Sequence, residues 1–350
     1  MNIPAVQADA VVQQIVETTS SSGLTSLFYP QVFNAVALAP FHSVAIRTAL
    51  AGRASYWDIL FLVPGFLEQA DAHKVNNGEF PAVAAMSTGY IFRVENQATV
   101  AFLQRVGKTG HLVDIGVHKA SKSAYHEPVV TVLYTCGILA TAVVAILLVL
   151  INDTPALIFL GALATARLLN VIELKRRSPL GWKGAPENKP GDLLVLASQD
   201  RWLRIRGDTT DLKTVLSGQW LAEPGPADAL LAGGAALLVF GGLAFAMKAS
   251  ARGSFLVAGL LVTNAVLLVL CNALATKLHM FGCVAAVTGD SGLYKRRLEM
   301  ADQLLREARE ANYPLEWAVK IGLVNELPGD GPAAANLVPR SPAISPLIIM

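Results

Sequence analysis

VVTVLYTCGILATAVVAILLVLI, from Val129 to Ile151, is an apolar stretch without a single charge, and it has the length that crosses a lipid bilayer. A helix needs roughly 20 apolar residues to span a hydrocarbon core about 30 Å thick. Three further stretches have the same character: Pro155 to Ile172, Ala227 to Met247 and Ser254 to Ala275. The sequence therefore predicts a mainly α, polytopic membrane protein with about four transmembrane helices.

The composition supports this class of protein. Hydrophobic residues make up 53% of the chain and charged residues 15%, against roughly 25% charged in ordinary soluble domains. Mean hydropathy is +0.47. The net charge is only +2, and nucleic-acid binding needs a concentrated basic face. The lipid bilayer is therefore the expected partner, and a nucleic acid is not.

The hydropathy pattern also divides the chain into segments. We expect a flexible N-terminus (1–23), a mixed, membrane-associated region (24–128), a first transmembrane hairpin (129–172), a cytosolic β-containing loop (173–226), a second transmembrane hairpin (227–275), a cytosolic amphipathic region (276–326) and a disordered Pro-rich tail (327–350). Within the mixed region, Phe33 to Leu50 is broken by Pro40 and either spans the membrane or lies on it. Ile59 to Val63 is too short to span, and its apolar run favours a buried strand or an interfacial segment.

Basic residues predict the orientation, because cytosolic loops carry an excess of Lys and Arg. Nine of the 28 Lys and Arg residues flank the outer ends of the two hairpins: Lys119, Lys122, Lys175, Arg176, Arg177, Lys277, Lys295, Arg296 and Arg297. Lys248 and Arg252, between the third and fourth runs, oppose this pattern. The first basic residue is Arg47, so the N-terminus does not resemble a secretory signal or an Arg-rich presequence. We expect an integral protein of the endomembrane system or plasma membrane with both termini in the cytosol.

Arg167 is the only charged residue in the second run. An ionisable residue inside a membrane is a functional candidate by default. Arg167 lies five residues before Ile172, the expected end of its helix, so we expect its side chain to snorkel to the headgroups beside Lys175. Pairing with a polar residue of another helix and a role in ion or substrate binding are the alternatives. In the fourth run, Thr263 and Asn264 are expected to form hydrogen bonds between helices.

Small residues four positions apart recur in these runs and predict close helix packing. The pairs are Gly137 and Thr141, Gly161 and Thr165, Ala229 and Gly233, and Gly242 and Ala246. A compact bundle with so few central polar groups is a poor transport pathway.

The central loop predicts a small cytosolic β-hairpin. Leu193 to Ala197 is apolar, and Arg201 to Gly207 alternates charged and apolar residues with the period of a strand. Arg201, Arg204 and Arg206 are candidate contacts for anionic lipid or a protein partner, although a solvated strand face is the favoured explanation. Lys295, Arg296 and Arg297 open an amphipathic helix and are candidates of the same kind. Both basic clusters are expected near the anionic cytosolic leaflet.

Metal and cofactor sites are not expected. Cys136, Cys271 and Cys283 lack metal or redox spacing. His111, Asp114 and His118 would share one face of a helix, but the intervening β-branched residues favour a strand, which places Asp114 on the face opposite His111.

Three segments carry a resemblance: GDLLVLASQDRWLRIRGDTTDLKTVLSGQWL (Gly191 to Leu221), LYKRRLEMADQLL (Leu293 to Leu305) and EWAVKIGLV (Glu316 to Val324). They resemble a family of uncharacterised filamentous-fungal multi-pass integral membrane proteins. The resemblance implies a fungal source and a shared topology, and it assigns no catalytic residue.

These observations favour a non-catalytic docking or accessory protein of the membrane. A membrane enzyme acting on a lipophilic substrate in fungal specialised metabolism is the first alternative. A small transporter or channel is the second, and it would require a homo-oligomer.

Overall fold

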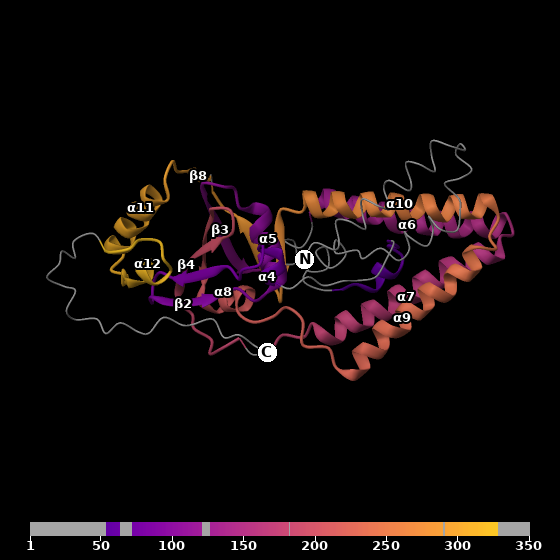
Figure 1. Cartoon of the computed structure of the whole chain (residues 1–350), viewed down its shortest axis with the longest axis horizontal. Helices are drawn as coiled ribbons and strands as arrows, with labels where there is room; N and C mark the ends of the chain where they lie inside the picture. Colours follow the sequence, from indigo (N-terminus) through magenta and orange to yellow (C-terminus); the bar gives the residue numbers. More distant parts are fainter. Residues whose placement is uncertain (1–53, 64–71, 121–126, 182, 290, 328–350) are drawn as a thin grey trace.

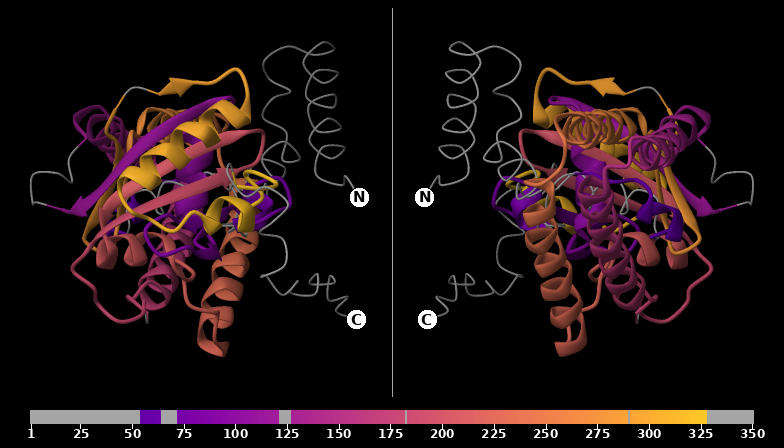
Figure 2. Two further views of the ribbon diagram at one scale, coloured as in Figure 1. Left: turned by 90° about the vertical axis from the view of Figure 1, so that its left-hand side faces the viewer. Right: turned by 90° about the vertical axis from the view of Figure 1, so that its right-hand side faces the viewer.

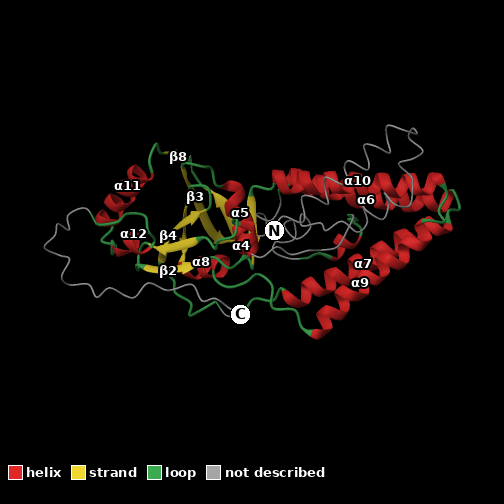
Figure 3. Ribbon diagram, viewed as in Figure 1, coloured by secondary structure: helices red, strands yellow, loops and turns green. Residues whose placement is uncertain are grey.

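The computed structural model describes residues 54–63, 72–120, 127–181, 183–289 and 291–327. Long helices occupy one end of the molecule and a β-sheet the other (Figure 1 and Figure 3). The predictions for residues 1–23, for Phe33 to Leu50 and for the tail beyond residue 327 lie outside the described residues.

The four predicted transmembrane helices are confirmed as helices of spanning length and hydropathy. They are α6 (Pro128–Leu150), α7 (Thr154–Arg177), α9 (Pro226–Ala246) and α10 (Ala251–Leu274). The protein therefore fits insertion into a membrane as a polytopic protein. The second helix continues to Arg177, beyond the expected end at Ile172, so its basic residues form its last turn.

The two hairpin turns meet at the end of the bundle farthest from the sheet. Asp153 caps α7 through the Ala156 amide at 3.1 Å. Its other carboxylate oxygen accepts hydrogen bonds from the Ser250 amide at 2.9 Å and the Ser250 hydroxyl at 2.5 Å. Gly253 permits this contact, because a Cβ there would lie 2.0 Å from the Asp153 carboxylate. The Asp153 carboxylate thus caps the start of α7 and holds Ser250, the N-cap residue of α10, so that it joins the two hairpins.

From this junction the helices run as two pairs, α7 with α9 and α6 with α10 (Figure 1). Of the predicted small-residue contacts, Gly242 packs against Phe159 and Ala162, and Gly137 is also at a contact. Gly161 and Gly233 have open space around them. The small-residue pattern therefore marks only some of the close approaches.

Residues 54–63 lie between the two helix pairs, as the indigo segment of Figure 1 shows. They begin with the 3-10 turn η2 (Tyr56–Ile59), which is capped by Ser55. The Phe61 ring is buried against Gly137 of α6, 5.3 Å from the centre of the Tyr134 ring. Leu62 belongs to the apolar core of the bundle. This segment, which we call the wedge, is therefore buried between the helices at Phe61 and Leu62, but it is a 3-10 turn and loop rather than the strand expected for Ile59 to Val63.

The sheet has eight strands, so "mainly α" and "small hairpin" describe this protein only in part. Its order is β2-β1-β4-β5-β3-β7-β6, with β8 paired to β3. The strands are β1 (Ala82–Ala85), β2 (Tyr90–Arg93), β3 (His111–Lys119), β4 (Pro190–Ala197), β5 (Arg201–Asp208), β6 (Lys277–Met280), β7 (Cys283–Val287) and β8 (Gly292–Leu293). The predicted β4–β5 hairpin is present, but it is the centre of a sheet built from all three extramembrane segments. The region 276–326, expected to be only amphipathic, supplies three of the strands.

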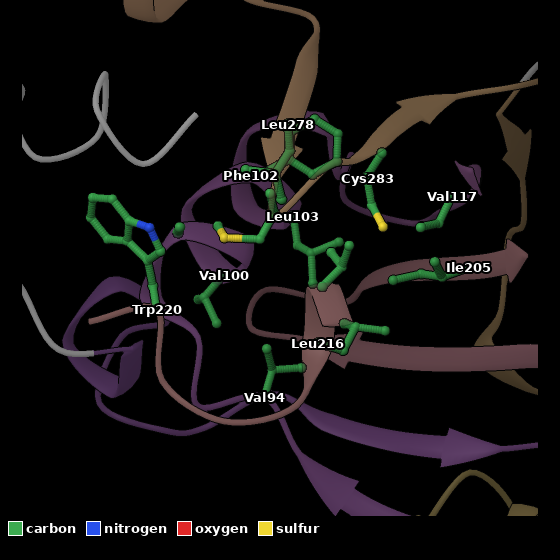
Figure 4. Close-up of a cluster of buried hydrophobic side chains, with 14 of the residues drawn as sticks. Val94, Val100, Phe102, Leu103, Val117, Ile205, Leu216, Trp220, Leu278 and Cys283 are labelled. Carbon is green, nitrogen blue, oxygen red and sulfur yellow. The ribbon is translucent and has the colours of Figure 1, made fainter. Parts of the chain in front are cut away.

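Helices cover both faces of this sheet. The shorter helices are α4 (Ala72–Val75), α5 (Gln97–Val106), α8 (Thr209–Leu216), α11 (Arg297–Glu310) and α12 (Glu316–Lys320). On one face, α5 and α8 bury a core that includes Phe102, Leu103, Ile205 and Leu216 (Figure 4). Val171 and Leu174 of α7 join this core and attach the bundle to the sheet.

On the other face, α11 and α12 pack over Leu112, Leu194 and Trp202. Figure 2 shows α11 lying across the strands. This face of the sheet is turned away from the membrane helices (Figure 1).

The packing of Phe61 against Gly137 of α6 gives a testable prediction. A Cβ at Gly137 would lie 2.3 Å from Cε2 of Phe61, so Gly137→Ala should destabilise the purified protein by about 1–3 kcal/mol through overpacking. Gly161→Ala is the matched control, because nothing lies within 4 Å of its Cβ position. Denaturation in detergent measures both changes. Phe61→Leu should restore much of the lost stability in the Gly137→Ala background, and equal effects of the two alanines would show that the wedge does not pack there.

Candidate functional site

Arg167 is the most deeply placed of the predicted site residues. It precedes Arg177, the end of α7, by ten residues, which corresponds to about 15 Å of helix. The residue is only 9% exposed, and its Nε donates to the carbonyl oxygen of Asp58 at 3.3 Å. The predicted snorkelling to the headgroups is therefore wrong, because the helix is longer than expected and the wedge brings an acceptor into the bundle.

Asp58 is the functional candidate that the sequence analysis missed. It is 2% exposed and enters the bundle on the wedge. Its carboxylate accepts hydrogen bonds from the Tyr134 hydroxyl and from the Ser55 amide, both at 2.7 Å. The available signal was the sequence Ser55-Tyr56-Trp57-Asp58, in which a serine and an aspartate three residues apart can form a capping box. Together with Arg167, these contacts tie the wedge to α6 and α7.

Asn264 provides a second polar contact in the bundle. It is fully buried, and its Nδ2 donates to the Thr141 hydroxyl at 3.4 Å. The predicted interhelical hydrogen bond is confirmed for Asn264 and joins α10 to α6. Thr263, predicted with it, is exposed on α10.

The hairpin arginines differ from one another in the folded protein. Arg204 is buried, with its Nε and Nη2 on the Asp192 carboxylate at 2.5 to 3.1 Å. Its Nη1 donates to Glu307 of α11. Arg204 is therefore not available to lipid or to a partner, contrary to the prediction, because two carboxylates distant in the sequence enclose it.

The charges of this cluster are stabilised by one another. Burial alone would lower the pKa of Arg204, but hydrogen bonds to Asp192 and Glu307 raise it above its ordinary value. Burial would likewise raise the pKa of Glu307, but hydrogen bonds from Gln303 and Arg204 lower it. Gln303 in turn accepts a hydrogen bond from the Tyr294 hydroxyl at 2.7 Å. The cluster thus fixes α11 on the sheet.

Arg201 and Arg206 have other surroundings. Arg201 donates to the Gln104 carbonyl at 3.0 Å and to Gln199 at 2.8 Å, which joins β5 to α5. The Arg206 side chain is 52% exposed and lies 3.9 to 4.0 Å from the carboxylates of Asp192 and Asp114. Of the three hairpin arginines, Arg206 alone presents about half of its side chain to solvent.

Lys295, Arg296 and Arg297 are all exposed at the start of α11. Arg297 donates to the Gly322 carbonyl at 3.0 Å and so helps to hold the segment after α12. Because α11 covers the face of the sheet turned away from the bundle (Figure 1), the sheet separates α11 from the ends of the transmembrane helices. Two exposed leucines, Leu293 and Leu298, flank this basic cluster.

The three residues considered for metal binding do not come together as a site. His111, Asp114 and His118 lie on strand β3, which confirms the favoured strand over the helix. In the part of the chain that the structure describes, no three His, Cys, Asp or Glu side chains are close enough to hold a metal ion. Cys271 and Cys283 are buried, as expected for packing residues, whereas Cys136 is exposed on α6.

No protein-family model, no curated protein and no solved structure matches this chain. The resemblance to fungal membrane proteins therefore stays a prediction. The geometry offers two places of interest: the wedge in the bundle and the basic, partly apolar surface at the start of α11.

The buried cluster gives a prediction that separates neighbouring arginines. Arg204→Gln should destabilise the domain by about 3–5 kcal/mol, because it leaves two carboxylates without their cation. Arg206→Gln, two residues along the same strand, should change stability by less than about 1 kcal/mol, because its pairs are long and exposed. Hydrogen exchange should locate the loss of protection in α11. Similar effects of the two substitutions would contradict this account of Arg204.

Proposed function

We propose that this protein is a membrane-anchored docking protein whose α/β domain faces the cytosol and binds an acidic protein segment at the start of α11. The observation that carries the proposal is the surface formed by Leu293, Lys295, Arg296 and Leu298. All four residues are exposed. Among the described residues, no carboxylate oxygen lies within 4 Å of the Lys295 ammonium or the Arg296 guanidinium; the nearby Glu299 carboxylate instead accepts from the Lys295 backbone amide at 3.3 Å.

The distribution of charge along the helices supports the cytosolic orientation. The sheet-side ends carry Lys175, Arg176 and Arg177 on α7 and Lys277 after α10. The opposite end carries Lys248 and Arg252. The excess lies on the side of the sheet, which supports a cytosolic domain because cytosolic segments carry an excess of Lys and Arg.

The position of the surface favours a protein over the protein's own bilayer. Electrostatic attraction to anionic lipid falls off within a Debye length of about 8 Å at physiological ionic strength. The start of α11 is separated from the membrane helices by the sheet (Figure 1). Exposed leucines beside unpaired cations fit a partner that has both carboxylates and apolar side chains.

The domain is built to present this surface in a fixed position. Arg105 of α5 donates to the Asn272 carbonyl near the end of α10. The Ala222 amide donates to the Arg177 carbonyl at the end of α7, at 2.8 Å. The Arg204 cluster then fixes α11 to the sheet. A rigid platform of this kind lowers the conformational entropy lost on binding.

Orientation is tested by cysteine labelling of sealed microsomes with a membrane-impermeant maleimide, starting from a variant without the three native cysteines. Arg206→Cys, on the sheet, should react in intact microsomes. Lys248→Cys, at the other end of the bundle, should react only after detergent is added. The reverse pattern would place the domain in the lumen.

The docking surface is tested by charge reversal. A photo-crosslinker at Leu298 in cells should capture a partner, and Lys295→Glu with Arg296→Glu should weaken its binding about tenfold or more, as expected for two exposed ion pairs turned into repulsions. Lys119→Glu with Lys189→Glu makes the same change of charge at two exposed lysines and should have little effect, because Lys119 lies at the end of β3 opposite to the end that pairs with Leu293. Unchanged capture by the first variant, or equal loss in both, would refute the docking surface.

A further inference from the structure

We propose that Tyr56 and Trp57 of the wedge, together with Lys175 of α7, form a binding site for a phospholipid with an anionic headgroup. The proposal concerns the membrane-facing part of the molecule and is independent of the docking surface on α11. It rests on three observations: where the wedge is anchored, which charges of α7 are already paired, and which side chains stay exposed.

The wedge holds its aromatic residues in a defined place. Asp58 and Phe61 are buried and contact α6 and α7. The two residues between Ser55 and Asp58, by contrast, point outward: Tyr56 is 59% exposed and Trp57 is 64% exposed. A pair of exposed aromatic side chains is thus fixed beside the basic end of a transmembrane helix.

Lys175 differs from its two basic neighbours. Arg176 pairs with Asp228 at 3.0 Å, and Arg177 pairs with Glu173 at 2.8 Å. Lys175 has no carboxylate within 4 Å among the described residues, and its Nζ lies 3.7 Å from the centre of the Tyr56 ring. The ring positions the ammonium group without neutralising it, since a cation–π contact leaves the charge in place.

The chemistry of this group matches a phospholipid at the membrane surface. Trp and Tyr are enriched at the interface because they combine an apolar body with a polar tip. The Lys175 ammonium can donate to a headgroup phosphate, while the Tyr56 and Trp57 rings contact the upper acyl chain. Because the net charge of the group is positive, an anionic headgroup is favoured over a zwitterionic one.

The test measures lipid binding to the full-length protein in neutral detergent by native mass spectrometry, with phosphatidylserine and phosphatidylcholine as probes. The parent should retain phosphatidylserine in preference to phosphatidylcholine. Lys175→Gln should weaken phosphatidylserine binding about fivefold, the value of one basic residue near a membrane surface. Trp57→Leu should weaken the binding of both lipids.

Lys248→Gln is the matched control, because it removes an exposed lysine at the other end of the bundle and should leave binding unchanged. Equal binding of both lipids by the parent, or equal loss in Lys175→Gln and Lys248→Gln, would overturn the proposal. A third result would also overturn it: a lower thermal stability of Lys175→Gln without lipid, with its lipid preference intact, would show that Lys175 only supports the wedge. If Lys175→Gln does not fold, retention of parental binding by Trp57→Leu would refute the site.

Discussion

A polar group inside a bilayer must find its partner within the protein, because hydrocarbon offers none. The arrangement of the helix bundle depends on this constraint. Arg167 of α7 meets the carbonyl of Asp58, and the Asp58 carboxylate meets Tyr134 of α6, so that the wedge connects the two helix pairs. Asn264 and Thr141 connect α10 to α6 in the same way. Each contact fixes the relative position of two segments. Apolar surfaces alone specify that position weakly, because lipid provides no hydrophobic drive for helix association.

The sheet imposes a second constraint, which acts on the ends of the helices. Strand β3 leads into α6, β4 follows α7, and β6 follows α10, while β3, β4 and β5 lie side by side in the sheet. Pairing these strands therefore brings the ends of both hairpins to one side of the membrane. The Asp153–Ser250 contact closes the other end. The bundle is consequently held at both ends, and the wedge occupies the space between.

The sequence predicts these two parts of the molecule unequally, for a physical reason. A transmembrane helix satisfies its backbone within one segment, so local hydropathy suffices to find all four. The sheet depends on pairings between short strands far apart in the chain, such as Val83 with Val195 and Val117 with Ala285, and no local pattern reveals them. The alternation of Arg201 to Gly207 correctly predicts a strand. It does not reveal that Glu307, more than a hundred residues later, buries Arg204. The prediction for Arg167 fails for the same reason, because its acceptor, the Asp58 carbonyl, belongs to a segment that precedes the bundle in the sequence.

Two groups of basic residues differ in their partners among the described residues. Arg176, Arg177 and Arg204 hold the fold together through carboxylates on other turns, strands or helices. Lys175, Lys295 and Arg296 lie on exposed surfaces beside exposed apolar or aromatic residues, and the described carboxylates leave them unpaired. Folding accounts for the first group and not for the second. A cation that the fold leaves unneutralised keeps its field available to an outside ligand. We propose that its location selects the ligand: lipid for the lysine at the end of α7, and protein for the pair at the start of α11.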